Sequence, residues 1–346
     1  MEKLESSSTE RVAKTVHHIS PDRTPVFLGR IDDLEYWEQY FKVKGEEELR
    51  TYFGLDLRKV QYSGLFDVED GKTIWGTVDN WDAGYSTDRG GFVLEGAETV
   101  RDVETHYWPD PGGVDYEELR NRILAMDDAY PKILSLGWMP VLDTLFDLFG
   151  MENAMLYMYA RPELIEAAIT HIENFILDSM KKAMEYCAGE VEFYWCGDDF
   201  STQRGLMISP DMWRRFLKPS YSKIFSLIKS FGLKVWFHSC GTFRPVMPDL
   251  VDMGMDVWET VQAHLEGNEP SELKREFGRH ITFFGAINCQ TTLSFGSPND
   301  VRREVRERIH ILGKNGGYIC GPDHSIQKNM PAENLFALYD EARKIL

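Results

Sequence analysis

The regular alternation that begins at Pro131 is the feature that most constrains the fold of this chain. Short apolar runs alternate there with longer amphipathic stretches, which is the pattern of parallel strands joined by crossover helices. Candidate strands cover residues 133–137, 191–196, 234–238, 256–259, 281–286 and 317–320. Two earlier apolar runs, 26–28 and 59–62, bring the number of predicted strands to eight.

Eight strands interleaved with helices predict an α/β fold, a single (βα)₈ TIM-type barrel. Helical periodicity is clearest over 211–230, after the start signal Ser209-Pro210, and over 300–312. An open doubly wound sheet is the alternative, but no glycine-rich phosphate loop follows a predicted strand. We therefore predict an N-terminal extension and helix over 1–22 and a barrel catalytic domain over 23–346.

An irregular segment over about 75–113 interrupts the N-terminal half of the predicted barrel. It is rich in Gly, Asp and Trp and has no clean periodicity. We expect long loops with at most one strand or hairpin. Two interpretations stay open: an insertion that covers the barrel mouth, or a surface excursion without function.

Composition narrows the class of protein. The net charge of −18 argues against nucleic-acid binding, because no basic stripe is available to neutralise phosphates. No apolar run is long enough to span a bilayer, and the first ten residues lack the layout of a signal peptide. The 5 cysteines, an odd number, favour free thiols in a reducing compartment. We predict a cytoplasmic protein; the sequence is also compatible with a homo-oligomer.

Polar residues follow several predicted strands, where the active site of a (βα)₈ barrel lies. The strand ends carry Gly197-Asp198-Asp199, His238-Ser239-Cys240, Glu259, Asn288-Cys289 and the stretch from Cys320 to His324. Turns alone would require Gly, Asp, Asn and Ser. Because His and Cys are not turn formers, their presence at these ends indicates a functional site.

His238 and Cys240 are separated by one residue, so an extended segment places both on the same side. A thiolate beside an imidazole suits zinc, which needs a third ligand and an open position for catalysis. Cys320 and His324 are the candidates for the third ligand. The alternative is a buried thiol and a hydrogen-bonded histidine without metal.

Three carboxylates are candidate catalytic residues: Asp198, Asp199 and Glu259. Adjacent aspartates commonly cap a helix, but at a barrel mouth one of them would orient a zinc-bound histidine or hold a substrate proton. In an extended stretch only one of the two faces inward. Glu259 would complete a zinc site, act as an acid or base, or pair with an arginine.

Taken together, several blocks resemble the uroporphyrinogen-decarboxylase superfamily. They are His18-Ile19-Ser20-Pro21-Asp22-Arg23-Thr24-Pro25-Val26, Gly197-Asp198-Asp199 with Gln203, Ile208-Ser209-Pro210, Lys218-Pro219, His238-Ser239-Cys240-Gly241, Gly254-Met255-Asp256, Gly316-Gly317-Tyr318 and Pro331-Ala332-Glu333-Asn334. The resemblance runs from near residue 10 to the end and is weakest between about 65 and 130. It implies the (βα)₈ barrel.

Two departures count against the decarboxylase branch of that superfamily. Its members carry Arg-Gln-Ala-Gly-Arg-Tyr after the first strand, where this chain has Gly29-Arg30-Ile31-Asp32-Asp33 with Arg30 alone. They also present an aspartate after the second strand. This chain reads Gln61-Tyr62-Ser63-Gly64 there, with no acid before Asp67.

The sequence is closer to the zinc methyltransferases of the superfamily, which work with corrinoid proteins. Their zinc ligands are a His-x-Cys pair, matched by His238 and Cys240, and a distant cysteine. Counted back without gaps from Pro331-Ala332-Glu333-Asn334, that cysteine falls on His324. The resemblance thus implies His238, Cys240 and His324 as ligands, with Cys320 as the alternative.

These comparisons favour a zinc-dependent methyltransferase that moves a methyl group between a methoxylated aromatic or thiol substrate and a corrinoid protein. Arg30, Gln203 and Asn288 are candidate substrate-binding residues. No Asp-x-His-x-x-Gly corrinoid motif is present, so we expect cobalamin to be carried by a separate partner protein. The alternatives are a cofactor-free tetrapyrrole decarboxylase or tetrapyrrole-binding protein, and a barrel that only binds a small molecule or partner.

Overall fold

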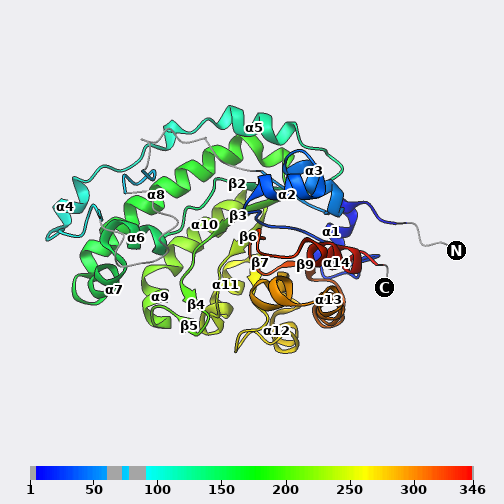
Figure 1. The fold of residues 1–346 in the computed structure, drawn as a ribbon. Coiled ribbons are helices and arrows are strands. Elements are labelled where there is room, and N and C mark those ends of the chain that lie inside the picture. The colour runs from blue at the N-terminus through cyan, green and yellow to red at the C-terminus, as the bar shows by residue number, and fades with distance from the viewer. Residues whose placement is uncertain (1–4, 61–71, 78–90, 345–346) are drawn as a thin grey trace.

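A parallel sheet forms the centre of the molecule in the computed structural model, which describes residues 5–60, 72–77 and 91–344 (Figure 1). Its strands are β1 (Arg58–Lys59), β2 (Lys132–Ser135), β3 (Phe193–Gly197), β6 (Lys234–His238), β7 (Met255–Val261), β8 (Thr282–Ile287) and β9 (Tyr318–Pro322). They lie side by side in that order, and every neighbouring pair is parallel. A separate antiparallel hairpin joins β4 (Ser201–Thr202) and β5 (Gly205–Leu206).

The sheet confirms the predicted α/β fold, and the predicted eight-stranded barrel is confirmed in part. Each strand predicted from residue 133 onward has a counterpart, and the predicted strand 59–62 corresponds to β1. Residues 61 and 62 lie outside the described part of the chain. Segment 26–28 contributes a single parallel bridge, from Val26 to Cys320. The Val26 carbonyl also accepts a hydrogen bond from the Asp56 amide (2.9 Å), so Val26 lies between the first and last strands.

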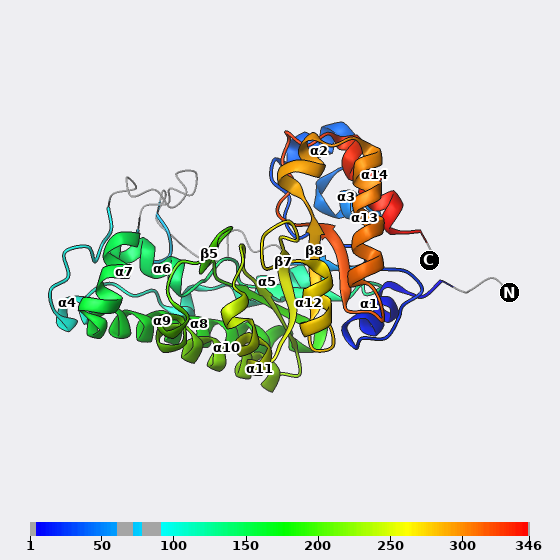
Figure 2. The same cartoon turned by 90° about the horizontal axis from the view of Figure 1, so that it is seen from below.

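Helices surround the sheet (Figure 2). They are α1 (Ser8–Val16), α2 (Leu34–Phe41), α3 (Gly45–Phe53), α4 (Val100–Glu104), α5 (Tyr116–Leu124), α6 (Leu142–Phe149), α7 (Met151–Ala160), α8 (Pro162–Cys187), α9 (Pro210–Phe216), α10 (Lys218–Ser230), α11 (Met247–Met253), α12 (Pro270–Phe277), α13 (Pro298–Leu312) and α14 (Ala332–Ala342), with short turns η3 (Pro111–Gly113), η4 (Ala188–Glu190), η5 (Arg244–Val246) and η6 (Cys289–Leu293). Helices α8 to α11 lie outside one half of the curled sheet, and α13 and α14 lie outside the other half.

The predicted helix over 211–230 is divided into α9 and α10. Ser209 begins α9 by accepting a hydrogen bond from the Met212 amide (3.2 Å). The break at Leu217 precedes Pro219, which cannot donate an amide hydrogen and is tolerated only in a first helical turn. The predicted helix over 300–312 is α13, which starts with a capping box formed by Ser297 and Asp300.

Two apolar layers follow from the alternation of side chains along the strands. The inner layer fills the space enclosed by the curled sheet with Phe27, Leu57, Ile133, Phe193, Trp195, Trp236, Val257, Phe284 and Ile319. Val12 and Val16 of α1 join this layer. The outer layer lies between sheet and helices and includes Cys320. Because Ile319 and Cys320 are neighbours on β9, their side chains belong to opposite layers.

The described part of the irregular segment 75–113 packs against α8. Residues 78–90, among them Trp81, lie outside the described residues. The described remainder contains α4 and η3 and no named strand. Trp75 packs on Phe175 of α8, with ring centroids 5.1 Å apart, and Trp108 stacks on His171 (4.6 Å). These tryptophans therefore contribute to packing on α8.

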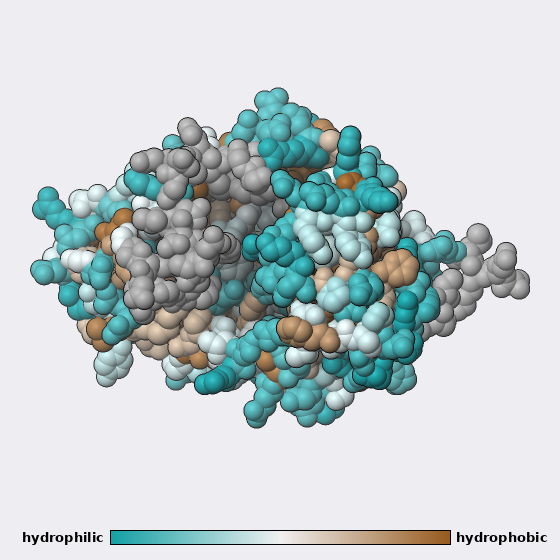
Figure 3. Space-filling view, viewed as in Figure 1, coloured by the Kyte–Doolittle hydropathy of each residue, from teal (hydrophilic) through white to brown (hydrophobic). Residues whose placement is uncertain are grey.

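The face seen in Figure 3 is mostly hydrophilic, as a net charge of −18 predicts. Apolar side chains are scattered on it rather than gathered in one broad patch. In the described chain even the longest helix, α8 with 26 residues, lacks the apolar length needed to cross a membrane.

Candidate metal centre

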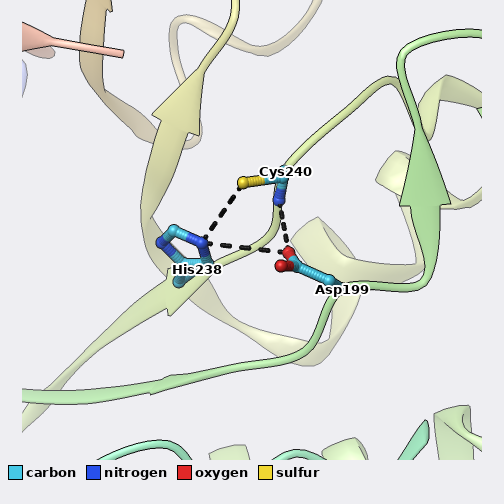
Figure 4. Close-up of side chains that lie close together, drawn as sticks. All are labelled: Asp199, His238 and Cys240. Atoms are coloured by element: carbon cyan, nitrogen blue, oxygen red, sulfur yellow. Dashed lines mark hydrogen bonds and ion pairs between the residues drawn. The ribbon is translucent and has the colours of Figure 1, made fainter. Parts of the chain in front are cut away.

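The carboxyl ends of β3 and β6 bring three possible metal ligands together. His238 is the last residue of β6 and pairs in register with Gly197, the last residue of β3. Asp199 follows two residues after Gly197, and Cys240 follows two residues after His238. Their ligand atoms all lie within 4.8 Å of one another (Figure 4). Within residues 5–60, 72–77 and 91–344, no other such group of three His, Cys, Asp or Glu side chains is this compact.

The side chains in this cluster face a common point. The Cys240 Sγ lies 3.5 Å from His238 Nε2, which lies 3.8 Å from Asp199 Oδ1. The Cys240 amide donates a hydrogen bond to the same Asp199 oxygen (2.8 Å), which fixes the carboxylate beside the turn. Imidazole, thiolate and carboxylate are all ligands that zinc accepts.

Glu259 orients His238 from the neighbouring strand. It is paired with His238 in the β6–β7 register, and its Oε1 lies 3.2 Å from His238 Nδ1. Its other oxygen accepts hydrogen bonds from Trp195 (3.1 Å) and Trp236. Because the carboxylate accepts from Nδ1, the Nε2 of His238 is left to face Cys240 and Asp199. A carboxylate that holds a ligating histidine in this way is typical of zinc sites.

The electrostatics of the cluster favour a positive charge at its centre. Burial alone would lower the pKa of His238, but Cys240, Glu259 and Asp199 together raise it well above its usual value. Burial alone would raise the pKa of Glu259, yet the hydrogen bond from His238 and the charge of Lys59 hold it below its usual value. Burial raises the pKa of the Cys240 thiol, and His238 opposes that shift. A bound cation would favour deprotonation of the thiol.

Asp198 does not take part in this cluster. Its carboxylate is buried and accepts hydrogen bonds from the amides of Val141 (3.1 Å), Leu142 (2.7 Å) and Asp143 (3.3 Å) at the start of α6. It also accepts one from the Tyr221 hydroxyl (2.6 Å). Burial raises the pKa of Asp198 to about 6. Asp198 thus anchors α6, and of the two adjacent aspartates only Asp199 faces His238 and Cys240.

The two predicted third ligands, Cys320 and His324, lie outside the group of ligand atoms that converge within 4.8 Å. Cys320 lies in the outer apolar layer, and burial raises the pKa of its thiol to about 12. His324 is exposed, with Nδ1 3.0 Å from the Ser325 hydroxyl, which donates to Asp32 (2.7 Å). Asp199, which the sequence had suggested as a catalytic residue, is the third member of the converging group.

The candidate substrate-binding residues lie in three different loops or turns of the described chain. Arg30 is exposed, and its Nε donates to Asp32 (2.9 Å). Gln203 is exposed in the turn between β4 and β5. Asn288 caps η6, because its Oδ1 accepts hydrogen bonds from the Gln290 (2.8 Å) and Thr291 (3.0 Å) amides. Asn288 thus has a local structural role.

Sequence reasoning missed two residues beside the cluster. Lys59 of β1 places its Nζ 3.5 Å from the centroid of the Trp195 ring, and burial lowers its pKa to about 8. Trp138 meets the His238 ring edge to face, with centroids 5.5 Å apart. Lys59 could have been noticed in the sequence, because it is a lysine within a predicted apolar strand. Trp138 lies in a loop, and no sequence pattern singled it out.

Comparison with known proteins identifies the family to which this protein belongs. Residues 143–345 match the family model described as uroporphyrinogen decarboxylase (URO-D), which spans more than half of the chain. This protein therefore belongs to the uroporphyrinogen-decarboxylase family, and the resemblance seen in its sequence motifs is confirmed. No curated protein matches the sequence.

Solved structures support the fold. A methyltransferase from Methanosarcina mazei is 16% identical in sequence, with 98% of each chain covered and a TM-score of 0.68. At that identity the likeness establishes the fold alone. The 3-keto-D-glucoside 4-epimerase YcjR from E. coli is 12% identical over 66% of this chain and 82% of its own, with a TM-score of 0.38, which is too low to bear on fold or function.

Proposed function

We propose that this protein is a zinc-dependent methyltransferase that moves a methyl group between a methoxylated aromatic or thiol substrate and a corrinoid protein. The observation that carries the proposal is the convergence of Asp199, His238 and Cys240 at the carboxyl end of the sheet. Membership of the family and a fold shared with a methyltransferase support it.

The three side chains fit zinc by their chemistry. One thiolate, one imidazole and one carboxylate make a set of three protein ligands, and a fourth position left to substrate is the arrangement of catalytic zinc sites. Glu259, behind His238, supplies the outer carboxylate that such sites use. When bound, zinc would act as a Lewis acid that lowers the pKa of a thiol or polarises an ether oxygen.

The residues around the cluster would shape the reaction. Glu259 holds His238 in one tautomer, since its carboxylate accepts from Nδ1. The Asp199 carboxylate is held by the Cys240 amide, so both ligands are positioned before substrate enters. Trp138 packs edge to face against the His238 ring and supports its orientation. The corrinoid would reach this mouth on a separate protein.

The alternative, a tetrapyrrole decarboxylase, has less support from the described residues. It predicts an arginine-lined pocket, but Arg30 is exposed and paired with Asp32. After the second predicted strand the sequence reads Gln61-Tyr62-Ser63-Gly64, without the aspartate of the decarboxylases. An imidazole–thiol–carboxylate group has no evident role in a cofactor-free decarboxylation.

Elemental analysis tests the proposal. We expect about one zinc per chain in the wild type, and loss of most of it in His238→Ala, Cys240→Ala and Asp199→Asn. Cys320→Ala is the matched control for Cys240→Ala and should keep its zinc, because its thiol lies in the outer apolar layer. His324→Ala decides whether that residue joins the site.

Two outcomes would contradict the proposal. A wild type that stays free of metal after zinc is supplied would exclude the zinc mechanism, and tetrapyrrole binding would then be measured. Zinc that is lost from Cys320→Ala but kept by Cys240→Ala would place the metal elsewhere.

A further inference from the structure

A second pair of ionisable side chains lies at the same end of the sheet. The Nδ1 of His264, in the loop after β7, lies 3.3 Å from Oδ2 of Asp323, which follows β9. Asp323 is 1% exposed, and its Oδ1 accepts a hydrogen bond from the Cys289 amide (2.8 Å) after β8. One carboxylate oxygen is thus fixed by backbone, and the other faces the imidazole.

The loop that carries His264 is tied to the turn of the candidate metal centre. The Gly241 amide, next to Cys240, donates to Gln262 Oε1 (2.7 Å). The Asn268 side chain donates to the carbonyls of Gly241 (3.0 Å) and Gln262 (3.2 Å). His264 lies between these two anchoring residues, so its backbone is held beside the turn that contains Cys240.

The free edge of the imidazole is accessible. The His264 side chain is 24% exposed. Its Nε2 has no partner within the residues that the structure describes. A histidine with one ring nitrogen 3.3 Å from a buried carboxylate oxygen and the other nitrogen free is arranged as a proton-transfer residue requires.

The other candidate acids near the cluster are already occupied. Glu259 uses both oxygens, on His238 and on two tryptophans. Asp198 is engaged by the start of α6 and by Tyr221. His324 is held by a hydroxyl, that of Ser325, rather than by a carboxylate. Among the described residues, the carboxylate-held ring of His264 is the group best arranged to exchange a proton.

We propose that His264 is the proton-transfer residue of this site, acting on the substrate heteroatom that loses or gains the methyl group, and that Asp323 positions it. The inference rests on the proposed methyl transfer. With an aryl methyl ether, the C–O bond breaks and its electron pair stays on oxygen. The methyl carbon would pass to the reduced corrinoid, whose electron pair would form the new bond and which the partner protein would supply. The proton on His264 Nε2 passes to that oxygen, and the phenol leaves neutral.

The leaving group provides a specific test of His264. Methyl transfer to reduced cobalamin is measured for two aryl methyl ethers, one that releases a weakly acidic phenol and one that releases a nitrophenol. We expect the rate of methyl transfer from the first substrate to be about 100-fold or more lower in His264→Gln than in the wild type, because general acid catalysis contributes that much. The loss should be several-fold at most with the nitrophenol ether, whose oxygen needs no proton to leave. His310→Gln, at an exposed histidine of α13, is the matched control and should leave the rates with both ethers unchanged.

Two further measurements separate this role from a structural one. Zinc content and the denaturant midpoint of His264→Gln should equal those of the wild type. Asp323→Asn should lose activity unequally with the two ethers, as His264→Gln does, because the imidazole loses the carboxylate that lies 3.3 Å from its Nδ1. Equal losses with the two ethers in Asp323→Asn would overturn the positioning role of Asp323.

The outcomes distinguish the inference from the proposed function. Equal losses with both ethers, or no loss, in a wild-type background that transfers methyl groups would overturn the role of His264 alone. A zinc-loaded wild type that transfers no methyl group from either ethers or thiols would overturn the proposed function, and the role of His264 with it.

Discussion

At the amino ends of the strands, buried charges neutralise one another. Asp56, ahead of β1, is fully buried and accepts hydrogen bonds from Arg11 (2.6 Å) and Arg23 (2.7 Å). It also accepts one from the Val26 amide (2.9 Å). At the carboxyl ends of β3 and β6, by contrast, the ligand atoms of Asp199, His238 and Cys240 converge on one point.

The difference indicates that the two ends of the sheet have different roles: charged residues at the amino ends of the strands stabilise the fold, and those at the carboxyl ends are arranged for chemistry. Around Asp56 each charge has an opposite charge within hydrogen-bonding distance, so these residues neutralise one another without a bound ion. In the candidate metal centre a carboxylate, a thiol and an imidazole crowd together, an arrangement that a cation would stabilise. This division matches the general behaviour of (βα)₈ barrels, whose carboxyl face is catalytic and whose amino face stabilises the fold. Four predictions test it.

The largest effect is expected at the amino end. Asp56→Asn leaves the buried guanidinium of Arg23 without its buried carboxylate partner, so we expect it to lower the free energy of unfolding by about 3–5 kcal/mol. Denaturant unfolding measures the change. Asp211→Asn removes an exposed carboxylate that pairs with Arg214 and should change stability by about 0.5 kcal/mol at most. If folded Asp56→Asn lost its zinc, stability at the amino ends of the strands and metal binding at their carboxyl ends would not be separate.

The adjacent aspartates should respond in opposite ways. Asp199→Asn should weaken zinc binding by more than about 100-fold, since replacing an outer partner of a zinc ligand already costs about 10–100-fold. Asp198→Asn should keep zinc and lose about 1–3 kcal/mol of stability, because it weakens the anchor of α6. Zinc titration and unfolding are measured on both. The reverse pattern would show that the wrong aspartate was assigned to the metal.

Glu259→Gln tests whether the carboxylate that contacts His238 contributes to zinc binding at the carboxyl end of the sheet. The amide removes the charge that orients His238, so zinc affinity should fall by about 10–100-fold while the fold is kept. Competition with a chelator measures the affinity. If Glu259→Gln bound zinc as tightly as the wild type, the carboxylate would have no part in the metal centre.

The smallest effect concerns Lys59 and pH. Burial lowers its pKa to about 8, below the value of about 10.4 in an unfolded chain. Between those values the unfolded state binds more protons, so this residue makes stability rise with pH. Lys59→Met should therefore flatten the rise in unfolding free energy from about pH 8 to 10. Lys328→Met, at an exposed lysine, is the control; an unchanged slope in Lys59→Met would contradict the burial of Lys59.

Much of the fold could be predicted from local patterns. The strands from residue 133 onward were recognisable because each is a short apolar run followed by a helical one. The division at Leu217 was missed, although Pro219 signalled it, because helical periodicity continues across the break. The contribution of Val26 was overestimated, since an apolar run does not reveal how many bridges a neighbour will form.

The sequence by itself determined the pair His238 and Cys240, because period-two alternation places residues i and i+2 on one side whatever the rest of the chain does. It also determined the family, through motifs spread over much of the chain. Only the tertiary structure decided that Asp199 rather than Asp198 joins the pair, and that Cys320 faces the helices. Those choices depend on the register of β3 against β6 and of β8 against β9, and a one-residue shift in register would reverse every side chain.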